Sequence, residues 1–534
     1  MVKSMKLFNA QQANSRTTNS IFNFASSVGG ELIAIVMQFV VRTVFIATLG
    51  KSYLGINGLF SNILSMLSLA EFGVGSAIIF KLYEPIYKGD KHRITILIKF
   101  YKNVYRLIGV FVAIVGVSLI PFLPLLIKEY DKLTRLNINA PIIFCLYLAK
   151  SVSSYLFFAY KGAIIKANQK EYIINITAYF FTVGAAIVQI ITLLLFPKFE
   201  LYVLISVLQI ILQNLACAVI ANRMYPYINE KTEDKLGKDE VREVFKDCTA
   251  LFLYKLNGVV LKATDNIVLS IFLGLEAVGL YSNYYIFYTT INALFNKIFN
   301  SVSHSLGNLH ASQEKDREYE VFKATVLITA LLGGTAGVGI FVVSNEFIQI
   351  WIGDEWVIAQ PFSLLMGIET FTLAVRICIS KFRTTMGLFQ QAKYRPVFGM
   401  LINLIVSVML VRVWGISGVL VGTIMADWLT TMWFDPIIIH KYGYKNRYPV
   451  SNYFFAIIKY LLIAFTVGEV DYLICTHFMT GYSWFSVIIH SAIVVLTVPV
   501  VLLAITFNKS EGKYVRKLGM GYVHKLTRKR KRKG

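Results

Sequence analysis

Residues 26–48 read SSVGGELIAIVMQFVVRTVFIAT, an apolar stretch whose only charged side chains are Glu31 and Arg42. A helix needs about 20 mostly apolar residues to cross the hydrocarbon core of a bilayer, and this stretch is long enough. Comparable stretches recur along the whole chain of 534 residues. This repetition decides the fold class, and we expect an all-α polytopic membrane protein.

The composition excludes a soluble protein. Hydrophobic residues make up 56% of the chain and charged residues only 16%, against about 25% charged residues in soluble domains. A soluble chain of this length would form about three or four domains, and their surfaces would need far more polar residues. The formal net charge of +23 must therefore lie mainly in loops and tails.

A window of membrane-spanning length predicts about fourteen transmembrane helices. An even number puts both termini on the same side of the membrane. The predicted spans are 26–48, 56–80, 105–127, 139–160, 173–196, 200–221, 249–272, 278–303, 321–344, 357–380, 396–414, 416–439, 453–474 and 483–507.

The basic residues give the orientation, because cytoplasmic loops are enriched in Lys and Arg. One set of loops holds 40 of the 53 basic residues, and the opposite set holds six. Both termini belong to the basic set, so we expect both to be cytoplasmic. The basic segments are the N-terminal tail, 81–106, 161–170, 222–248, 306–323, 381–395, 440–449 and the C-terminal tail.

Some charged residues fall inside the predicted spans, where a charge facing lipid is expensive. In the first span Glu31, Gln38 and Arg42 lie on one stripe of a helix, and Lys255 and Lys262 share a stripe in the seventh. Near these lysines lies Asp265, and the other buried carboxylates are expected at Glu71, Glu369 and Asp427.

Polar stripes on several helices predict one hydrated, net-cationic chamber between helical bundles. In this interpretation the substrate contacts are Arg42, Lys255, Lys262 and Arg376. The carboxylates Glu31, Glu71, Asp265, Glu369 and Asp427 would couple to an ion or pair with cavity cations. The alternative is ion pairing that only fixes the packing of helices. Two further basic residues, Lys150 and Lys459, are expected to extend toward a membrane interface.

A short motif occurs twice. The pattern LGxxxxG occupies 49–55 and again 273–279, after six predicted spans. Two six-helix halves are typical of transporters, with the site near the midplane between them. We therefore predict an N-terminal bundle at 1–221, a cytoplasmic linker at 222–248, a second bundle at 249–439, helices 13 and 14 within 440–507, and a basic tail at 508–534.

Other motifs predict no further chemistry. The five cysteines contain no CxxC pair, so we expect neither a disulfide framework nor a metal site. The sequence Gly50-Lys51-Ser52 lacks the earlier glycine of a phosphate-binding loop, and no cofactor is expected. The basic C-terminal run is interpreted as a topology and lipid-contact signal, not as a nucleic-acid site.

The segment that begins at Arg42 resembles a known family. The residues that carry the likeness are Leu49-Gly50, Tyr53 to Leu64 (YLGINGLFSNIL) and Leu67 to Ile78 (LSLAEFGVGSAI). They resemble bacterial capsule, exopolysaccharide and O-antigen type flippases, the polysaccharide transporter branch of the multidrug/oligosaccharidyl-lipid/polysaccharide exporter superfamily.

The resemblance implies two six-helix bundles arranged in a V, with two extra C-terminal helices. It also implies a function: transport of polyprenyl-diphosphate-linked oligosaccharides from the inner to the outer leaflet of a bacterial plasma membrane by alternating access. Cationic cavity residues would bind the diphosphate or acidic sugars, and Arg42 matches such a position by motif. Membrane lipids and other polysaccharide assembly proteins are the implied partners.

Two other function classes stay open. A drug or cation antiporter of the same superfamily would favour acidic cavity residues, whereas this chain has mostly basic ones. A membrane polysaccharide polymerase or glycosyltransferase would need a large external loop or soluble domain, and the predicted external loops are short. We therefore expect a transporter and not an enzyme.

Overall fold

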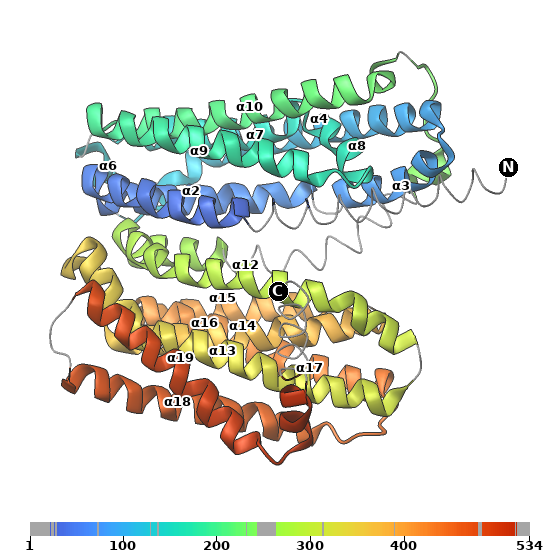
Figure 1. Cartoon of the computed structure of the whole chain (residues 1–534). Helices are drawn as coiled ribbons and strands as arrows, with labels where there is room; N and C mark the ends of the chain where they lie inside the picture. Colours follow the sequence, from blue (N-terminus) through green and yellow to red (C-terminus); the bar gives the residue numbers. More distant parts are fainter. Residues whose placement is uncertain are drawn as a thin grey trace, which may run out of the picture. The chain divides into compact units, whose positions relative to one another are not determined.

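The computed structural model describes residues 22, 26, 29–71, 74–128, 130–135, 138–230, 232–242, 263–311, 314–388, 390–392, 394–478, 483–517 and 520. Every regular element in these ranges is a helix. The chain divides into two compact units, Met1–Gly279 and Leu280–Gly534, and each is drawn as a helical bundle in Figure 1. The all-α prediction is therefore confirmed.

The first unit begins, after the apolar helix Gly29–Leu49, with a run of helices of very different lengths. Helix α10 packs against α9 and α7, and α7 packs against α4 (Figure 1). The helices are α2 (Lys51–Leu67), α3 (Val74–Lys88), α4 (Lys91–Leu119), α5 (Leu123–Leu126), α6 (Tyr130–Arg135), α7 (Ala140–Leu156), α8 (Gly162–Ala167), α9 (Glu171–Leu195) and α10 (Phe199–Met224). The helix Ala263–Phe272 also belongs to this unit.

Helices α13 and α14 pack against each other at the centre of the second unit. Helix α13 packs against α14, α18 and α19, and α15 packs against α16. In the most apolar stretch of α14, 78% of residues are buried, against 17% in α9 of the first unit. Helix α14 is therefore a core helix. The elements are α12 (Leu275–Ala311), whose first turn up to Gly279 belongs to the first unit, α13 (Lys315–Ile352), α14 (Gln360–Thr385), α15 (Arg395–Trp414), α16 (Ile416–Leu429), α17 (Thr431–Ile438), α18 (Ser451–Phe478) and α19 (Trp484–Thr506).

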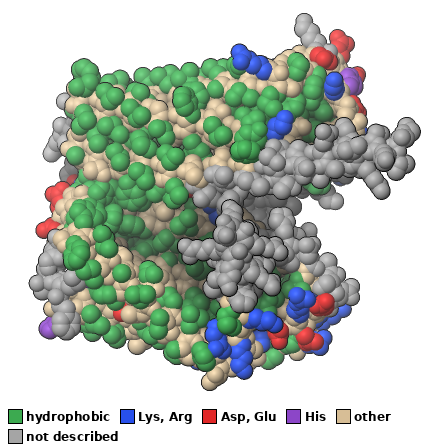
Figure 2. All heavy atoms as spheres, in the orientation of Figure 1, with side chains coloured by type: hydrophobic (Ala, Val, Ile, Leu, Met, Phe, Trp, Pro, Cys, Tyr) green, Lys and Arg blue, Asp and Glu red, His purple; other side chains and the backbone are tan. Residues whose placement is uncertain are grey.

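The described residues contain ten helices that are long and apolar enough to cross a membrane, and an eleventh span if the bent pair Ala140–Leu156 and Ala159–Ala167 is counted as one. Large hydrophobic side chains cover much of the visible face of each unit (Figure 2), as expected for surfaces in contact with lipid. The chain is thus a multi-pass membrane protein.

The remaining three of the fourteen predicted spans stay predictions. Span 56–80 is interrupted between α2 and α3 by the short 3-10 helix Ser68–Glu71. Span 249–272 lies largely outside the described residues. Span 278–303 lies within α12, which is long enough but is not among the sufficiently apolar helices. The predicted boundaries of the two bundles also stay predictions.

Several predicted loops are helical. Segment 81–106 lies mostly within α3 and α4, because α4 begins at Lys91 and its first turns are amphipathic. Span prediction finds only the apolar part of such a helix. The bend after α7 was also not predicted, and there Phe158 has a left-handed backbone with φ of 58°.

The two copies of the LGxxxxG motif contact each other inside the first unit. Gly50 and Gly274 both have positive φ, 83° and 96°, a region that favours glycine. A Cβ atom on Gly55 would lie 2.0 Å from the carbonyl oxygen of Leu275, and one on Gly279 would lie 2.8 Å from that of Lys51. The repeated glycines therefore allow two backbones to approach closely.

We expect Gly55→Ala to lower the free energy of unfolding by about 1–3 kcal/mol. The new methyl group would overlap backbone atoms of Leu275, and backbone atoms cannot move aside as a flexible side chain can. The measurement is the apparent melting temperature of the purified protein in detergent. Gly184→Ala is the matched control, since nothing lies within 4 Å of its added Cβ. Equal melting temperatures for both variants would contradict the close approach.

Candidate functional site

A cavity of about 380 Å³ lies within the first unit. Helix Gly29–Leu49 and helices α2, α7, α9 and α10 all contribute to its wall. The cavity is lined by Ala34, Met37, Gln38, Val41, Arg42, Phe45, Leu54, Asn57, Lys150, Thr182, Ala185, Ala186, Gln189, Tyr202 and Gln209. Five helices thus line one space.

Two basic side chains, Arg42 and Lys150, line this cavity, and both are half-buried. Arg42 comes from the predicted polar stripe, and Gln38 of the same stripe lines the cavity too. Lys150, which is expected from the sequence to extend toward a membrane interface, also lies among the cavity residues. Among the described residues that form the wall there is no Asp or Glu. The cavity is therefore suited to an anion.

Polar side chains in the wall are held by hydrogen bonds. Gln189 Nε2 donates to the carbonyl oxygen of Tyr202 (3.1 Å) and to Ser206 Oγ (2.9 Å). Gln209 Nε2 donates to Thr182 Oγ1 at 3.3 Å. On apolar spanning helices such polar groups provide partners for water or for a hydroxylated ligand.

The predicted carboxylates of the first unit do not line the cavity. Tyr179 OH donates to Glu31 Oε2 at 3.4 Å, and Tyr105 OH donates to Glu71 Oε1. Asp265 is buried in the helix Ala263–Phe272, with 3% of its surface exposed. Lys255 and Lys262 lie outside the described residues, so their predicted role stays a prediction.

The second unit brings together three predicted residues. Arg376 Nη1 on α14 donates to Asp427 Oδ2 on α16 at 2.5 Å. Arg376 Nη2 donates to the hydroxyl of Tyr288 at 2.9 Å, and this hydroxyl donates to Glu369 Oε1 at 3.0 Å. Asp427 and Glu369 are buried, with 1% and 2% of their surfaces exposed.

The ion pair with Asp427 affects which role Arg376 can have. Its charge is compensated by a buried carboxylate, as in the alternative interpretation of ion pairing. About 22% of the Arg376 side chain is nevertheless exposed, so the ion pair is not fully enclosed. The cluster joins α12, α14 and α16 within the second unit.

A second buried cluster was not predicted. Asp435 on α17 is fully buried and accepts hydrogen bonds from Arg383 Nε (3.1 Å) and from Arg395 Nη1. Both arginines had been placed in the cytoplasmic loop 381–395. Arg383 lies instead inside α14 and is 1% exposed. The signal that could have identified this cluster is Asp435, a second carboxylate beside Asp427 within the span 416–439.

A third cluster joins α13 and α19 in the same unit. Glu346 accepts a hydrogen bond from Ser486 Oγ, and its other oxygen lies 2.7 Å from His490 Nδ1. Glu346 and His490 are both buried. No group of three or more His, Cys, Asp or Glu side chains in the described ranges is arranged to hold a metal ion.

Comparison with known proteins identifies the family. A family profile described as "polysaccharide biosynthesis protein" matches residues 50–361, more than half of the chain. The chain belongs to this family. The resemblance noted in the segment that begins at Arg42 is thereby confirmed.

Individual relatives agree with this assignment. A probable low-salt glycan biosynthesis flippase of Haloferax volcanii is 24% identical over 206 residues, which cover 37% of this chain and 43% of that protein. The chain thus spans less than half the length of this curated relative.

The fold is shared with solved transporters. A lipid II flippase, MurJ, in an inward closed conformation is similar with a TM-score of 0.67 at 14% identity, covering 91% of this chain and 99% of the other. An inward-facing multidrug resistance MATE family transporter of the MOP superfamily has a TM-score of 0.59 at 12% identity, covering 76% and 94%. At these identities the likeness concerns the fold alone.

Proposed function

We propose that this polysaccharide biosynthesis family member is a flippase. It moves polyprenyl-diphosphate-linked oligosaccharides from the inner to the outer leaflet by alternating access. The observation that carries the proposal is the cavity of the first unit, in which Arg42 and Lys150 stand among hydrogen-bonded amides. The related protein of Haloferax volcanii bears the name of a probable glycan biosynthesis flippase, which supports this substrate class.

The chemistry explains why such a cavity is needed. A diphosphate and its sugars would lose their water in the hydrocarbon core, at a cost of several kcal/mol for each unsatisfied polar group. Guanidinium and ammonium groups replace that water with charge-assisted hydrogen bonds. Glutamine and asparagine side chains in the wall offer partners to sugar hydroxyls. The prenyl chain can remain in the surrounding lipid.

The two other function classes fit less well. The MATE transporter shares the fold, but a cavity for cationic drugs would be expected to include carboxylates, whereas the lining contributes Arg42 and Lys150. For an enzyme, the described segments between spans on the proposed external side are short, including 196–198 and 353–359. We infer a non-enzymatic carrier in a bacterial plasma membrane with both termini cytoplasmic.

The test is a leaflet assay in proteoliposomes that contain a fluorescent polyprenyl-diphosphate oligosaccharide. We expect the inner-leaflet pool, which is initially protected from an impermeant glycosidase, to become accessible when the protein is present. Protein-free vesicles and heat-denatured protein are the controls. Movement of a lipophilic cation without movement of the glycolipid would favour the antiporter. Release of phosphate or formation of a new glycosidic bond would favour the enzyme.

A further inference from the structure

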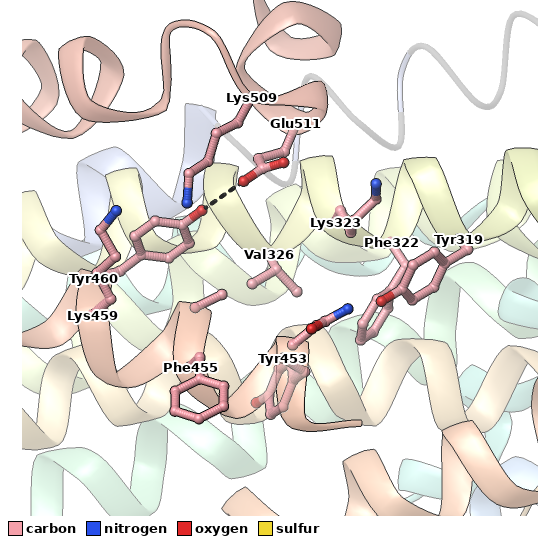
Figure 3. Close-up of a pocket in the computed structure, with 12 residues that line it drawn as sticks. Tyr319, Phe322, Lys323, Val326, Tyr453, Phe455, Lys459, Tyr460, Lys509 and Glu511 are labelled. Carbon is pink, nitrogen blue, oxygen red and sulfur yellow. Dashed lines mark hydrogen bonds between the residues drawn. The ribbon is translucent and has the colours of Figure 1, made fainter. Parts of the chain in front are cut away.

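A second pocket, of about 330 Å³, lies at one end of the second unit. Helix α13, helix α18 and the residues that follow α19 form its wall (Figure 3). None of the predicted transport residues takes part. The polar side chains in the wall include Lys323, Asn452, Lys459, Tyr460, Lys509 and Glu511.

The charges in this pocket do not balance. Three lysines face one carboxylate, that of Glu511. This carboxylate is already bonded to the protein, since Tyr460 OH donates to Oε1 at 3.3 Å and Ser510 Oγ donates to Oε2 at 3.1 Å. Lys323 Nζ donates to Ser510 Oγ at 2.8 Å. A net positive charge of about two thus remains around the pocket, and an anion would compensate it.

Two of the lysines are neighbours. Lys509 lies close enough to Lys459 for their ammonium groups to repel each other, and both approach Tyr460 at the same end of the pocket (Figure 3). They come from different segments, Lys459 from the first third of α18 and Lys509 from beyond the end of α19. A phosphate between them would turn a repulsion into two charge-assisted contacts.

The pocket lies near helix ends of the second unit. Helices α13 and α18 begin at this end of the unit, and α19 ends there. Just before α18, Arg447 Nη2 donates to Asp316 Oδ2 in the first turn of α13 at 2.7 Å. Lys and Arg side chains, with some Asp and Glu among them, gather on the lower part of the second unit beside its hydrophobic surface (Figure 2). Basic residues next to an apolar surface are typical of the level of lipid headgroups.

An apolar surface continues from the pocket along α18. Phe455 lines the pocket and is 74% exposed, and Leu462 is 62% exposed. Phe455, Lys459 and Leu462 are four and three residues apart in sequence, so they share one face of the helix. An ammonium group is therefore placed between large apolar side chains that face outward. A soluble anion would gain nothing from contact with this apolar surface, whereas an acyl chain would bury apolar area against it.

We propose that the pocket binds the phosphate of an anionic phospholipid from the leaflet at this end of the protein. Lys459 and Lys509 contact the phosphate, Lys323 and Asn452 contact the rest of the headgroup, and an acyl chain lies along Phe455 and Leu462. This site is separate from the proposed transport cavity. It does not depend on the flippase function, because a lipid can bind here whichever solute the protein carries.

The test is native mass spectrometry of the full-length protein in neutral detergent, titrated with phosphatidylglycerol or phosphatidylcholine. We expect selective retention of phosphatidylglycerol. The variant Lys459→Gln/Lys509→Gln is expected to weaken it about 10- to 30-fold, since each basic residue near a headgroup contributes about 1 kcal/mol. Lys513→Gln/Lys517→Gln is the matched control, because it removes two exposed lysines of the same segment that do not line the pocket.

Further measurements distinguish binding of a lipid phosphate from binding of free phosphate. Inorganic phosphate should not displace the lipid, and Phe455→Ser should weaken retention of phosphatidylglycerol. Equal weakening by both lysine pairs, equal retention of the two lipids, or full displacement by inorganic phosphate would each overturn the proposal. If the double variant does not fold, Lys509→Gln alone, at an exposed position, is expected to weaken binding several-fold, and unchanged binding would again overturn it.

Discussion

Arg42→Ala is expected to reduce the flipping of polyprenyl-diphosphate oligosaccharides by about 10- to 100-fold. The guanidinium is the only group in the cavity wall, among the described residues, with a planar fork that fits two phosphate oxygens at once. A hydrogen bond to a charged group contributes about 1.5–3 kcal/mol, which corresponds to this range of rates if it forms only during passage. The measurement is the initial rate in the proteoliposome assay.

Matched variants make this prediction specific. Arg106→Ala removes an exposed arginine of α4 that does not line the cavity, and we expect a rate close to that of the wild type. Arg42→Lys should recover part of the rate, because it keeps the charge and loses the bidentate geometry. Lys150→Gln should lower the rate less than Arg42→Ala. A wild-type rate for correctly inserted Arg42→Ala would exclude Arg42 as a substrate contact.

The largest effect on stability is expected at Asp435. Asp435→Ala leaves Arg383 and Arg395 buried without the carboxylate that both contact; 2% and 9% of their side chains are exposed. Breaking a buried ion pair by removal of one partner is destabilising by about 3–5 kcal/mol. We therefore expect a large fall in the apparent melting temperature and loss of monodisperse protein in detergent.

Two comparisons check the cause of this loss. Asp354→Ala removes an exposed carboxylate of the same unit and should leave the melting temperature unchanged. The triple variant Arg383→Met/Arg395→Met/Asp435→Leu should recover much of the stability, because hydrophobic residues of similar volume often replace a buried ion cluster without loss. A wild-type melting temperature for Asp435→Ala would contradict the role of the cluster.

The sequence predicts the fold class well because each spanning helix satisfies its own backbone hydrogen bonds. Apolar length alone then identifies the element. The same criterion misses amphipathic turns. The predicted span therefore begins at residue 105, although α4 itself begins at Lys91. It also cannot detect the break at Ser68–Glu71, because the criterion averages over a whole span whereas the change to a 3-10 helix covers only four residues.

The candidate site was predictable only in part. Periodicity identified Arg42, because a stripe on one helix is a local property. Pairing across helices is not local: Arg376 and Asp427 are 51 residues apart, and Arg383 and Asp435 are 52 apart. Lys150 lies within the predicted span 139–160, but its place in the cavity depends on four other helices. The packing of the helices determines which charged side chains form ion pairs and which face a cavity. The spacing of residues in the sequence does not.

The contact between the two LGxxxxG segments is reciprocal. The last glycine of each copy approaches the third residue of the other, Gly55 toward Leu275 and Gly279 toward Lys51. This exchange of equivalent positions is the mark of an isologous interface in a homodimer, and gene duplication followed by fusion of an ancestral dimer would leave it behind. The third position of the motif is nevertheless charged in one copy, Lys51, and apolar in the other, Leu275, so the contact is reciprocal in the backbone but not in the side chains.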